Sequence, residues 1–61
     1  MNKNMFHILV VDDDDRIREL IKQYLEKNNF LVTSAKDTLD ARKKLEIVKF
    51  DILILDIMMP G

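Results

Sequence analysis

The sequence predicts an α/β domain in which three strands of a parallel sheet alternate with two helices. Two short aliphatic runs, Ile8–Val11 and Ile52–Leu55, each end on an aspartate. Between them, the apolar spacing changes to the 3.6-residue period of an amphipathic helix. Alternation of strand and helix is typical of right-handed crossover connections, and therefore of a parallel sheet.

The first strand is predicted over residues 5–11, where only His7 interrupts the apolar run. A continuous run rich in β-branched residues favours a strand that is buried on both faces. A helix then begins near Asp15, and its apolar residues recur at helical spacing: Ile17, Leu20, Ile21, Tyr24 and Leu25. Asp14 or Asp15 can cap its first turn. Asn28-Asn29 can end it, because Asn tolerates the left-handed conformation.

The second strand is predicted over residues 30–35, and a second helix with a weaker apolar stripe begins at Asp37 or Thr38. The basic residues 42–44 on that helix indicate a solvated face. The third strand is Ile52–Leu55, and His7 is interpreted as a packed or edge histidine rather than a ligand.

Length and composition limit how such a domain can be stabilised. With 61 residues, the chain is at most one small domain, whose core alone seldom supplies more than roughly 3–5 kcal/mol. It has no cysteine, which excludes disulfides and thiolate metal sites, and one histidine cannot build a zinc site. We therefore expect association to stabilise the fold.

The net charge of −1 gives no global attraction to nucleic acid or to a membrane surface. No apolar stretch reaches the roughly 18 residues that a membrane span needs. The N-terminal Met-Asn-Lys-Asn lacks the apolar region of a secretory signal. These features predict a cytoplasmic protein without membrane or nucleic-acid contact by this segment.

The aspartates at the strand ends are the candidate functional residues. If the first and third strands are neighbours, Asp12, Asp13 and Asp56 gather at one edge of the sheet, where ligands of such sheets bind. Close carboxylates raise one another's cost of ionisation, and Mg²⁺ removes that cost. The alternative interpretation, a solvated and helix-capping acidic loop, is retained for Asp14 and Asp15.

The chain resembles the receiver domain of response regulators in two-component signalling. The acidic pair after the first strand carries the resemblance, together with residues 51–61, Asp-Ile-Leu-Ile-Leu-Asp-Ile-Met-Met-Pro-Gly. The resemblance covers residues 1–61 as the N-terminal half of that domain, truncated after the phosphoacceptor loop. It implies half of a flavodoxin-like doubly wound sheet, with βαβαβ order and strand order 2-1-3.

The resemblance also implies a role for each site residue. Asp56 would accept a phosphoryl group from a histidine kinase, so the chain would be a signalling protein rather than an enzyme. Asp13 would bind Mg²⁺ directly and Asp12 directly or through water, while Asp56 and the backbone carbonyl of Met58 would complete the protein ligands. A carboxylate is a suitable nucleophile for this transfer, and Mg²⁺ neutralises phosphoryl charge.

Departures from the family's pattern affect both packing and function. Thr38 and Asn29 stand where the family commonly has Gly, with Thr38 a good helix N-cap, and Arg42 stands where an apolar residue is usual. The family's later Ser/Thr, Lys and switch aromatic match no residue here. We therefore expect weak Mg²⁺ binding and slow or absent phosphorylation, because the cationic group that clamps the phosphoryl is missing.

In the order 2-1-3 the third strand becomes an uncharged apolar edge, which predicts a homodimer through that edge. Two other interpretations stay open. Asp12/Asp14 or Asp13/Asp15 have the spacing of haloacid-dehalogenase-like phosphohydrolases, and the chain could be a non-signalling fragment that folds only as a dimer. Dinucleotide binding is disfavoured, because the only glycine is Gly61.

Overall fold

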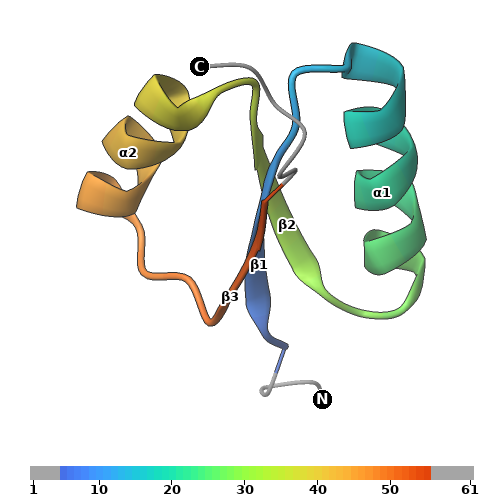
Figure 1. The fold of residues 1–61 in the computed structure, drawn as a ribbon. Coiled ribbons are helices and arrows are strands. Elements are labelled where there is room, and N and C mark those ends of the chain that lie inside the picture. The colour runs from blue at the N-terminus through green and yellow to red at the C-terminus, as the bar shows by residue number, and fades with distance from the viewer. Residues whose placement is uncertain (1–4, 56–61) are drawn as a thin grey trace.

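In the computed structural model, which describes residues 5–55, one parallel three-stranded sheet carries a helix on each face (Figure 1). The elements are β1 (His7–Val11), α1 (Asp15–Lys27), β2 (Leu31–Ala35), α2 (Thr38–Ile47) and β3 (Ile52–Leu55). The sheet order is β2-β1-β3, and both pairings are parallel. The predicted α/β class and strand order are confirmed.

The central strand β1 forms the core of the molecule. Ile8, Leu9, Val10 and Val11 are each at most 2% exposed, because β2 and β3 flank the strand and the two faces are covered. One face packs Leu9 and Val11 against Ala35 of β2 and Ala41 of α2. The prediction of a strand buried on both faces is confirmed.

The strands begin slightly later than the apolar pattern suggested. β1 starts at His7 rather than at residue 5, and β2 starts at Leu31 rather than at residue 30. The ladder opens with a 3.0 Å hydrogen bond from the N–H of Leu31 to the carbonyl of Phe6. Phe6 and Phe30 directly precede β1 and β2, and their rings stack with centroids 6.5 Å apart.

Side-chain carboxylates fix the starts of both helices. Asp14 caps α1 by accepting hydrogen bonds from the N–H of Arg16 and Ile17. Asp37 caps α2 by accepting from the N–H of Asp40 at 2.8 Å. Thr38 is therefore the first helical residue and not the N-cap, so the capping role predicted for it was wrong; the carboxylate one position earlier satisfies the free N–H.

The end of α1 follows the predicted chemistry. Asn29 has a φ of 69°, the left-handed conformation that Asn tolerates better than most residues. The N–H groups of Asn28 and Phe30 both donate to the carbonyl of Leu25, which closes the last turn. This turn directs the chain back into β2, parallel to β1.

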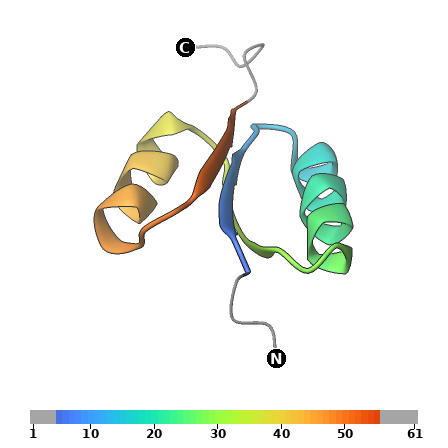
Figure 2. The same ribbon diagram turned by 90° about the horizontal axis from the view of Figure 1, so that it is seen from below.

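The two helices leave the third strand uncovered. They lie on opposite sides of the sheet, as Figure 2 shows from below, and they contact β2 and β1. No Cα of either helix lies within 8 Å of a Cα of β3. Over residues 5–55, neither helix has the length and apolar character needed to cross a membrane.

Candidate functional site

The carboxyl ends of the three parallel strands meet at one edge of the sheet. The pairing of β1 with β3 runs to its last position, Val11 opposite Leu55. The chain continues from these paired residues into Asp12 on one strand and Asp56 on the other. Asp56 and Met58 lie outside the described residues, so the geometry of the candidate site is given by Asp12 and Asp13.

Asp12 is held firmly at the end of β1. Its backbone N–H donates to the carbonyl of Ala35 at 3.1 Å, which extends the ladder with β2 by one bond. Its Oδ1 accepts a hydrogen bond from the N–H of Asp14 at 2.9 Å. Asp12 is 6% exposed, and it is the only charged residue that is buried in the described part of the chain. A carboxylate this buried needs a partner for its charge.

Arg18 braces the same turn from the first helix. Its Nη1 donates to the backbone carbonyl of Asp12 at 2.8 Å, and its Nη2 pairs with the carboxylate of Asp15. The fork-shaped guanidinium thus ties the end of β1 to the first turn of α1. In the sequence, the i,i+3 spacing of Arg18 from Asp15 was the available signal for their ion pair.

The four consecutive aspartates take different roles in the structure. Asp13 is exposed beside buried Asp12, whereas Asp14 is the N-cap of α1 and Asp15 pairs with Arg18. The prediction that Asp14 and Asp15 serve the helix start is confirmed. In the phosphohydrolase alternative, Asp14 or Asp15 would be the second acid of the pair. In the structure, Asp14 instead caps the helix and Asp15 is paired with Arg18.

The described residues do not complete a metal site by themselves. Between residues 5 and 55, no three carboxylate or imidazole side chains are grouped closely enough to hold a metal ion. Asp12 and Asp13 contribute oxygen donors of the kind that Mg²⁺ prefers. The other predicted ligands, Asp56 and the carbonyl of Met58, belong to the stretch outside those residues.

A second polar network fastens α2 to the outer edge of β2. The Nζ of Lys44 donates to the carbonyl of Ser34 at 2.6 Å and to the carboxylate of Asp40 at 3.2 Å. The same carboxylate accepts from the N–H of Lys36 at 3.3 Å. The interpretation of residues 42–44 as a solvated face was therefore wrong for Lys44, which reaches back to the sheet. Its i,i+4 spacing from Asp40 was the signal that could have indicated this.

This network acts on the ionisation of Asp40. The hydrogen bond from the backbone N–H of Lys36 holds the pKa of Asp40 below its ordinary value of 3.8, and the bond from Lys44 adds to this effect. Both donors favour the charged carboxylate, and they outweigh the opposing effect of desolvation.

His7 occupies the opposite end of the sheet from the aspartates. Its Nε2 lies 2.8 Å from the hydroxyl of Thr33, and its ring lies 4.5 Å from that of Phe50, centroid to centroid. Its backbone N–H donates to the carboxylate of Asp51 at 2.8 Å. The prediction of a packed histidine is confirmed, and these contacts connect β1 with the entrance to β3.

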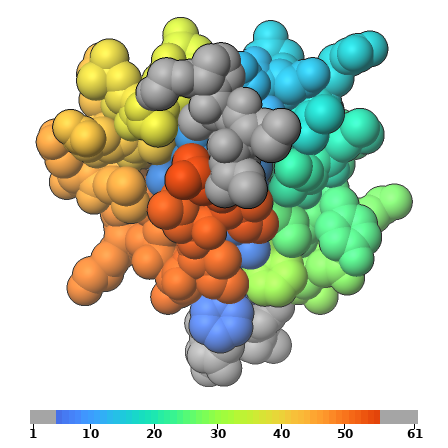
Figure 3. Space-filling model, viewed as in Figure 1, coloured from blue at the N-terminus to red at the C-terminus, as the bar shows by residue number. Residues whose placement is uncertain are grey.

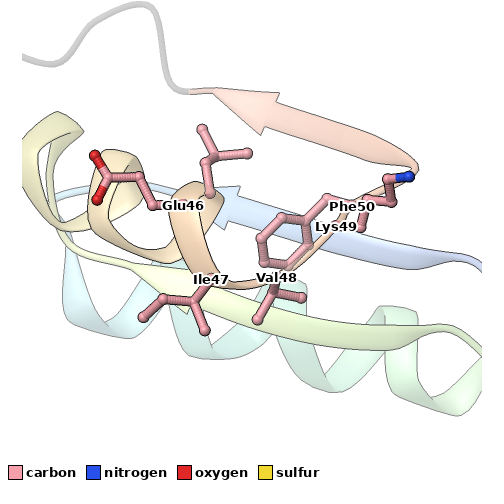
Figure 4. A pocket seen from close by; sticks show the side chains of 6 residues that line it. Glu46, Ile47, Val48, Lys49 and Phe50 are labelled. Atoms are coloured by element: carbon pink, nitrogen blue, oxygen red, sulfur yellow. The ribbon is translucent and has the colours of Figure 1, made fainter.

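One hollow of the described chain lies away from the aspartates. It has a volume of about 460 Å³ and is lined by residues 45–50, where α2 leads into β3 (Figure 4). Glu46 and Lys49 point to opposite sides of this segment, as the same view shows. A hollow formed by one continuous segment, without converging polar groups, has no features of a catalytic centre.

Comparison with known proteins adds an independent observation. The profile of the family described as "Response regulator receiver domain" matches residues 8–61. The chain is 49% identical over 55 residues to protein PetR of Rhodobacter capsulatus, covering 90% of this chain and 23% of PetR. It is 43% identical over 58 residues to the transcriptional regulatory protein ResD of Bacillus subtilis, covering 95% of this chain and 24% of ResD.

A third relative is the alkaline phosphatase synthesis transcriptional regulatory protein PhoP of Bacillus subtilis, 43% identical over 60 residues, covering 98% of this chain and 24% of PhoP. The chain thus spans about a quarter of the length of these curated relatives. No solved structure matches it.

Proposed function

Because the chain belongs to the response regulator receiver domain family, we propose that Asp56 is the phosphoacceptor of a two-component signalling protein. In this role its carboxylate oxygen attacks the phosphorus of a phosphohistidine on a kinase. The O–P bond forms as the P–N bond to the imidazole breaks, which leaves an acyl phosphate on Asp56 and the histidine free. The chain thus serves as the acceptor in a relay rather than as an enzyme that turns over a substrate.

The observation that carries this proposal is the state of the acidic pair at the end of β1. Asp12 is buried and oriented by the N–H of Asp14, while its neighbour Asp13 is exposed beside it. Val11 and Leu55 are paired in the sheet, and in the sequence Asp12 directly follows Val11 and Asp56 directly follows Leu55. Three carboxylates on adjacent strand ends are a suitable place for a cation-assisted transfer.

Asp12, Asp13, Asp56 and the carbonyl of Met58 are the proposed ligands of Mg²⁺. The donor chemistry fits, because all four supply oxygen and the bond from Asp14 occupies only one oxygen of Asp12. When bound, the metal neutralises charge on the phosphoryl oxygens. Arg18 holds the carbonyl of Asp12 at 2.8 Å and so keeps the backbone of this turn in place.

We expect these 61 residues alone to bind Mg²⁺ weakly and to be phosphorylated slowly. The family's Ser/Thr and Lys that would contact the phosphoryl group match no residue of this sequence, and losing such a charged contact typically lowers the rate by orders of magnitude. Adding the complementary half of a receiver domain should raise the rate.

Self-association through β3 and a cytoplasmic location complete the proposal. The exposed aliphatic side chains of β3 support self-association, since more than 40% of each of them is exposed: Ile52, Leu53 and Leu55. An exposed apolar edge strand without charge or proline is an expected site of strand pairing.

The phosphoacceptor is tested by labelling with a small-molecule phosphodonor in the presence of Mg²⁺. Labelling of the wild type and of Asp14→Asn, which keeps a good helix cap, should be equal. Labelling should be lost in Asp56→Asn. Label that persists in Asp56→Asn would remove Asp56 as the acceptor, and loss in Asp12→Ala with retention in Asp56→Asn would favour the phosphohydrolase alternative.

Metal binding has its own readout. Mn²⁺, a paramagnetic substitute for Mg²⁺, should broaden the amide resonances of residues 12–14 before those of the residues around His7 at the other end of β1. Asp13→Asn should weaken this effect by about tenfold or more, because a direct carboxylate ligand is lost. Broadening centred elsewhere would contradict the proposed ligands.

A further inference from the structure

The side chain of Arg18 reaches from the first turn of α1 back to the end of β1, and only 19% of it is exposed. Its Nη1 donates to the carbonyl of Asp12 at 2.8 Å. That carbonyl lies one residue beyond the last paired position of β1 with β2, Val11 opposite Ala35. Over residues 5–55, no backbone N–H donates to it. The guanidinium therefore holds the strand end at the point where the sheet ladder stops.

The same bond acts on Asp13 as well as on Asp12. The peptide unit between the two residues is planar, and the N–H of Asp12 is already fixed by its bond to Ala35. Fixing the carbonyl oxygen of this peptide unit therefore also fixes the direction of the N–H of Asp13. Asp13 is exposed and, within residues 5–55, makes no hydrogen bond of its own. The direction in which Asp13 leaves the strand thus depends on the bond from Arg18.

The two carboxylates of the acidic pair are held by different means. The carboxylate of Asp12 is oriented directly, because its Oδ1 accepts from the N–H of Asp14 at 2.9 Å. Asp13 is oriented only through its backbone. A cation that binds both carboxylates gains affinity when their relative orientation is fixed before it arrives, since less order is then lost on binding.

A guanidinium beside a cation site raises an electrostatic difficulty, because Arg remains charged and repels a metal ion. In this turn, the Nη2 of Arg18 pairs with the carboxylate of Asp15, whose side chain is 85% exposed. The pair carries no net charge, so Arg18 can hold the turn without making it cationic. An ion pair exposed on one side contributes little to stability. It matters more for where the guanidinium lies than for the free energy of unfolding.

We infer that Arg18 is a positioning residue of the Mg²⁺ site proposed above, on which the inference rests. Through the carbonyl of Asp12 it orients the peptide unit that leads to Asp13, and so sets the relative orientation of the two carboxylates. Residues that hold metal ligands in this way typically change metal affinity by about 10–100-fold. Figure 3 shows the start of α1, in light blue at the top right, at the surface of the molecule. A hydrated cation can therefore reach this turn from solvent.

Three variants separate the forked geometry of Arg18 from its charge. Arg18→Lys keeps the charge, but an ammonium group cannot reproduce the planar fork that serves Asp12 and Asp15 together. Arg18→Met removes the charge and both bonds. Arg16→Lys is the matched control, because Arg16 is an exposed residue of the same helical turn. Within residues 5–55, its guanidinium makes no hydrogen bond or ion pair.

The affinity of each variant for Mn²⁺ is measured from the broadening of the amide resonances of residues 12–14 during a titration. We expect Arg18→Lys to bind about tenfold more weakly than the wild type, and Arg16→Lys to bind equally. Arg18→Met should also bind more weakly, although the loss of a positive charge would by itself favour a cation. Circular dichroism establishes that each variant is folded during the titration, and Arg18→Lys keeps the test valid if Arg18→Met does not fold.

Urea titration without divalent cations separates this role from a purely structural one. A purely structural contact would lower stability and leave the Mn²⁺ affinity of the folded protein unchanged. Equal affinity of Arg18→Lys and the wild type, or tighter binding by Arg18→Met, would overturn the role of Arg18 while the proposed ligands stand. An equal loss of affinity in Arg16→Lys and Arg18→Lys would do the same, because the effect would not depend on the bond to Asp12.

The wild type shows whether the proposed site itself fails. Broadening of the wild type that is not centred on residues 12–14 overturns the ligands and the inference together. The labelling of Asp56 then remains a separate test of the phosphoacceptor.

Discussion

β1 and β3 are almost the same in sequence and opposite in environment. β1 contains the aliphatic run Ile-Leu-Val-Val and β3 is Ile-Leu-Ile-Leu, and in the sequence each run is followed by an aspartate. Yet Leu9 is fully buried while its pairing partner Leu53 is 51% exposed, and Val11 is 1% exposed while Leu55 is 46% exposed. An apolar strand is therefore a core strand only when strands flank both of its edges and both of its faces are covered. At the edge, the same residues form a surface that can bind another strand.

The largest expected difference between the two strands is in their response to truncation of a leucine. Leu9→Ala should lower the free energy of unfolding by about 2–5 kcal/mol, because it leaves a cavity in the packed core. That is comparable with the whole stability expected of a core this small. Urea titration followed by circular dichroism at low micromolar concentration measures it.

Leu53→Ala is the matched control on the edge strand. Roughly half of this side chain is already in water, so the cost in the same titration should be about 1 kcal/mol. Its main effect should be on association, seen as a higher dissociation constant of the dimer in sedimentation equilibrium. Equal losses of stability from the two substitutions would contradict the difference in burial.

The carboxyl end of β1 offers a second comparison, between neighbouring aspartates. Asp12→Ala should destabilise the fold by about 1–3 kcal/mol, because it leaves the N–H of Asp14 without its acceptor at a partly buried position. Asp13→Ala should change stability by less than about 0.5 kcal/mol, since its side chain is exposed. Denaturation without divalent cations separates this structural role of Asp12 from any metal binding.

Removing the bond from Lys44 to the carbonyl of Ser34 should leave a backbone group unbonded at the outer edge of β2. That edge could then pair with another strand, as is proposed for β3. Lys44→Met keeps the aliphatic part of the side chain but loses the bond to Ser34, at a cost of about 0.5–1 kcal/mol for this partly exposed contact. In sedimentation velocity at rising concentration, the variant should form species larger than a dimer. Lys43→Met, on the exposed part of the same helix, is the control and should remain dimeric.

The smallest expected effect is a pH dependence at the same edge. The pKa of Asp40 is lower in the folded protein than its ordinary value of 3.8, so its carboxylate stabilises the fold above that pH. This contribution is lost as the pH falls from about 3.8 through the lower folded pKa. The stability difference between the wild type and Asp40→Asn should therefore be constant near neutral pH and shrink in acid. A difference that grows in acid would have the wrong sign.

Much of the fold could be predicted because its signals are local. The change of apolar period at Asp15, the left-handed Asn29 and the capping by Asp14 each depend on a few neighbouring residues, and the structure confirms them. The division of the consecutive aspartates into a strand-end pair and a helix start was predictable for the same reason. The bonds from Lys44 to the carbonyl of Ser34 and from Arg18 to the carbonyl of Asp12 were not predictable, because each joins a helix to a strand end whose relative position is set by packing.

By itself, the sequence determined the elements, their order, and which residues stand at the carboxyl ends of the strands. Period and capping chemistry are local properties, and alternation of strand and helix requires parallel pairing. Only the tertiary structure decided which apolar strand is the core and which is an open edge, because burial depends on neighbours that a strand does not encode. It also decided that Asp12 is buried while Asp13 is exposed, and that α2 bonds to the outer edge of β2 whereas, over residues 5–55, neither helix contacts β3.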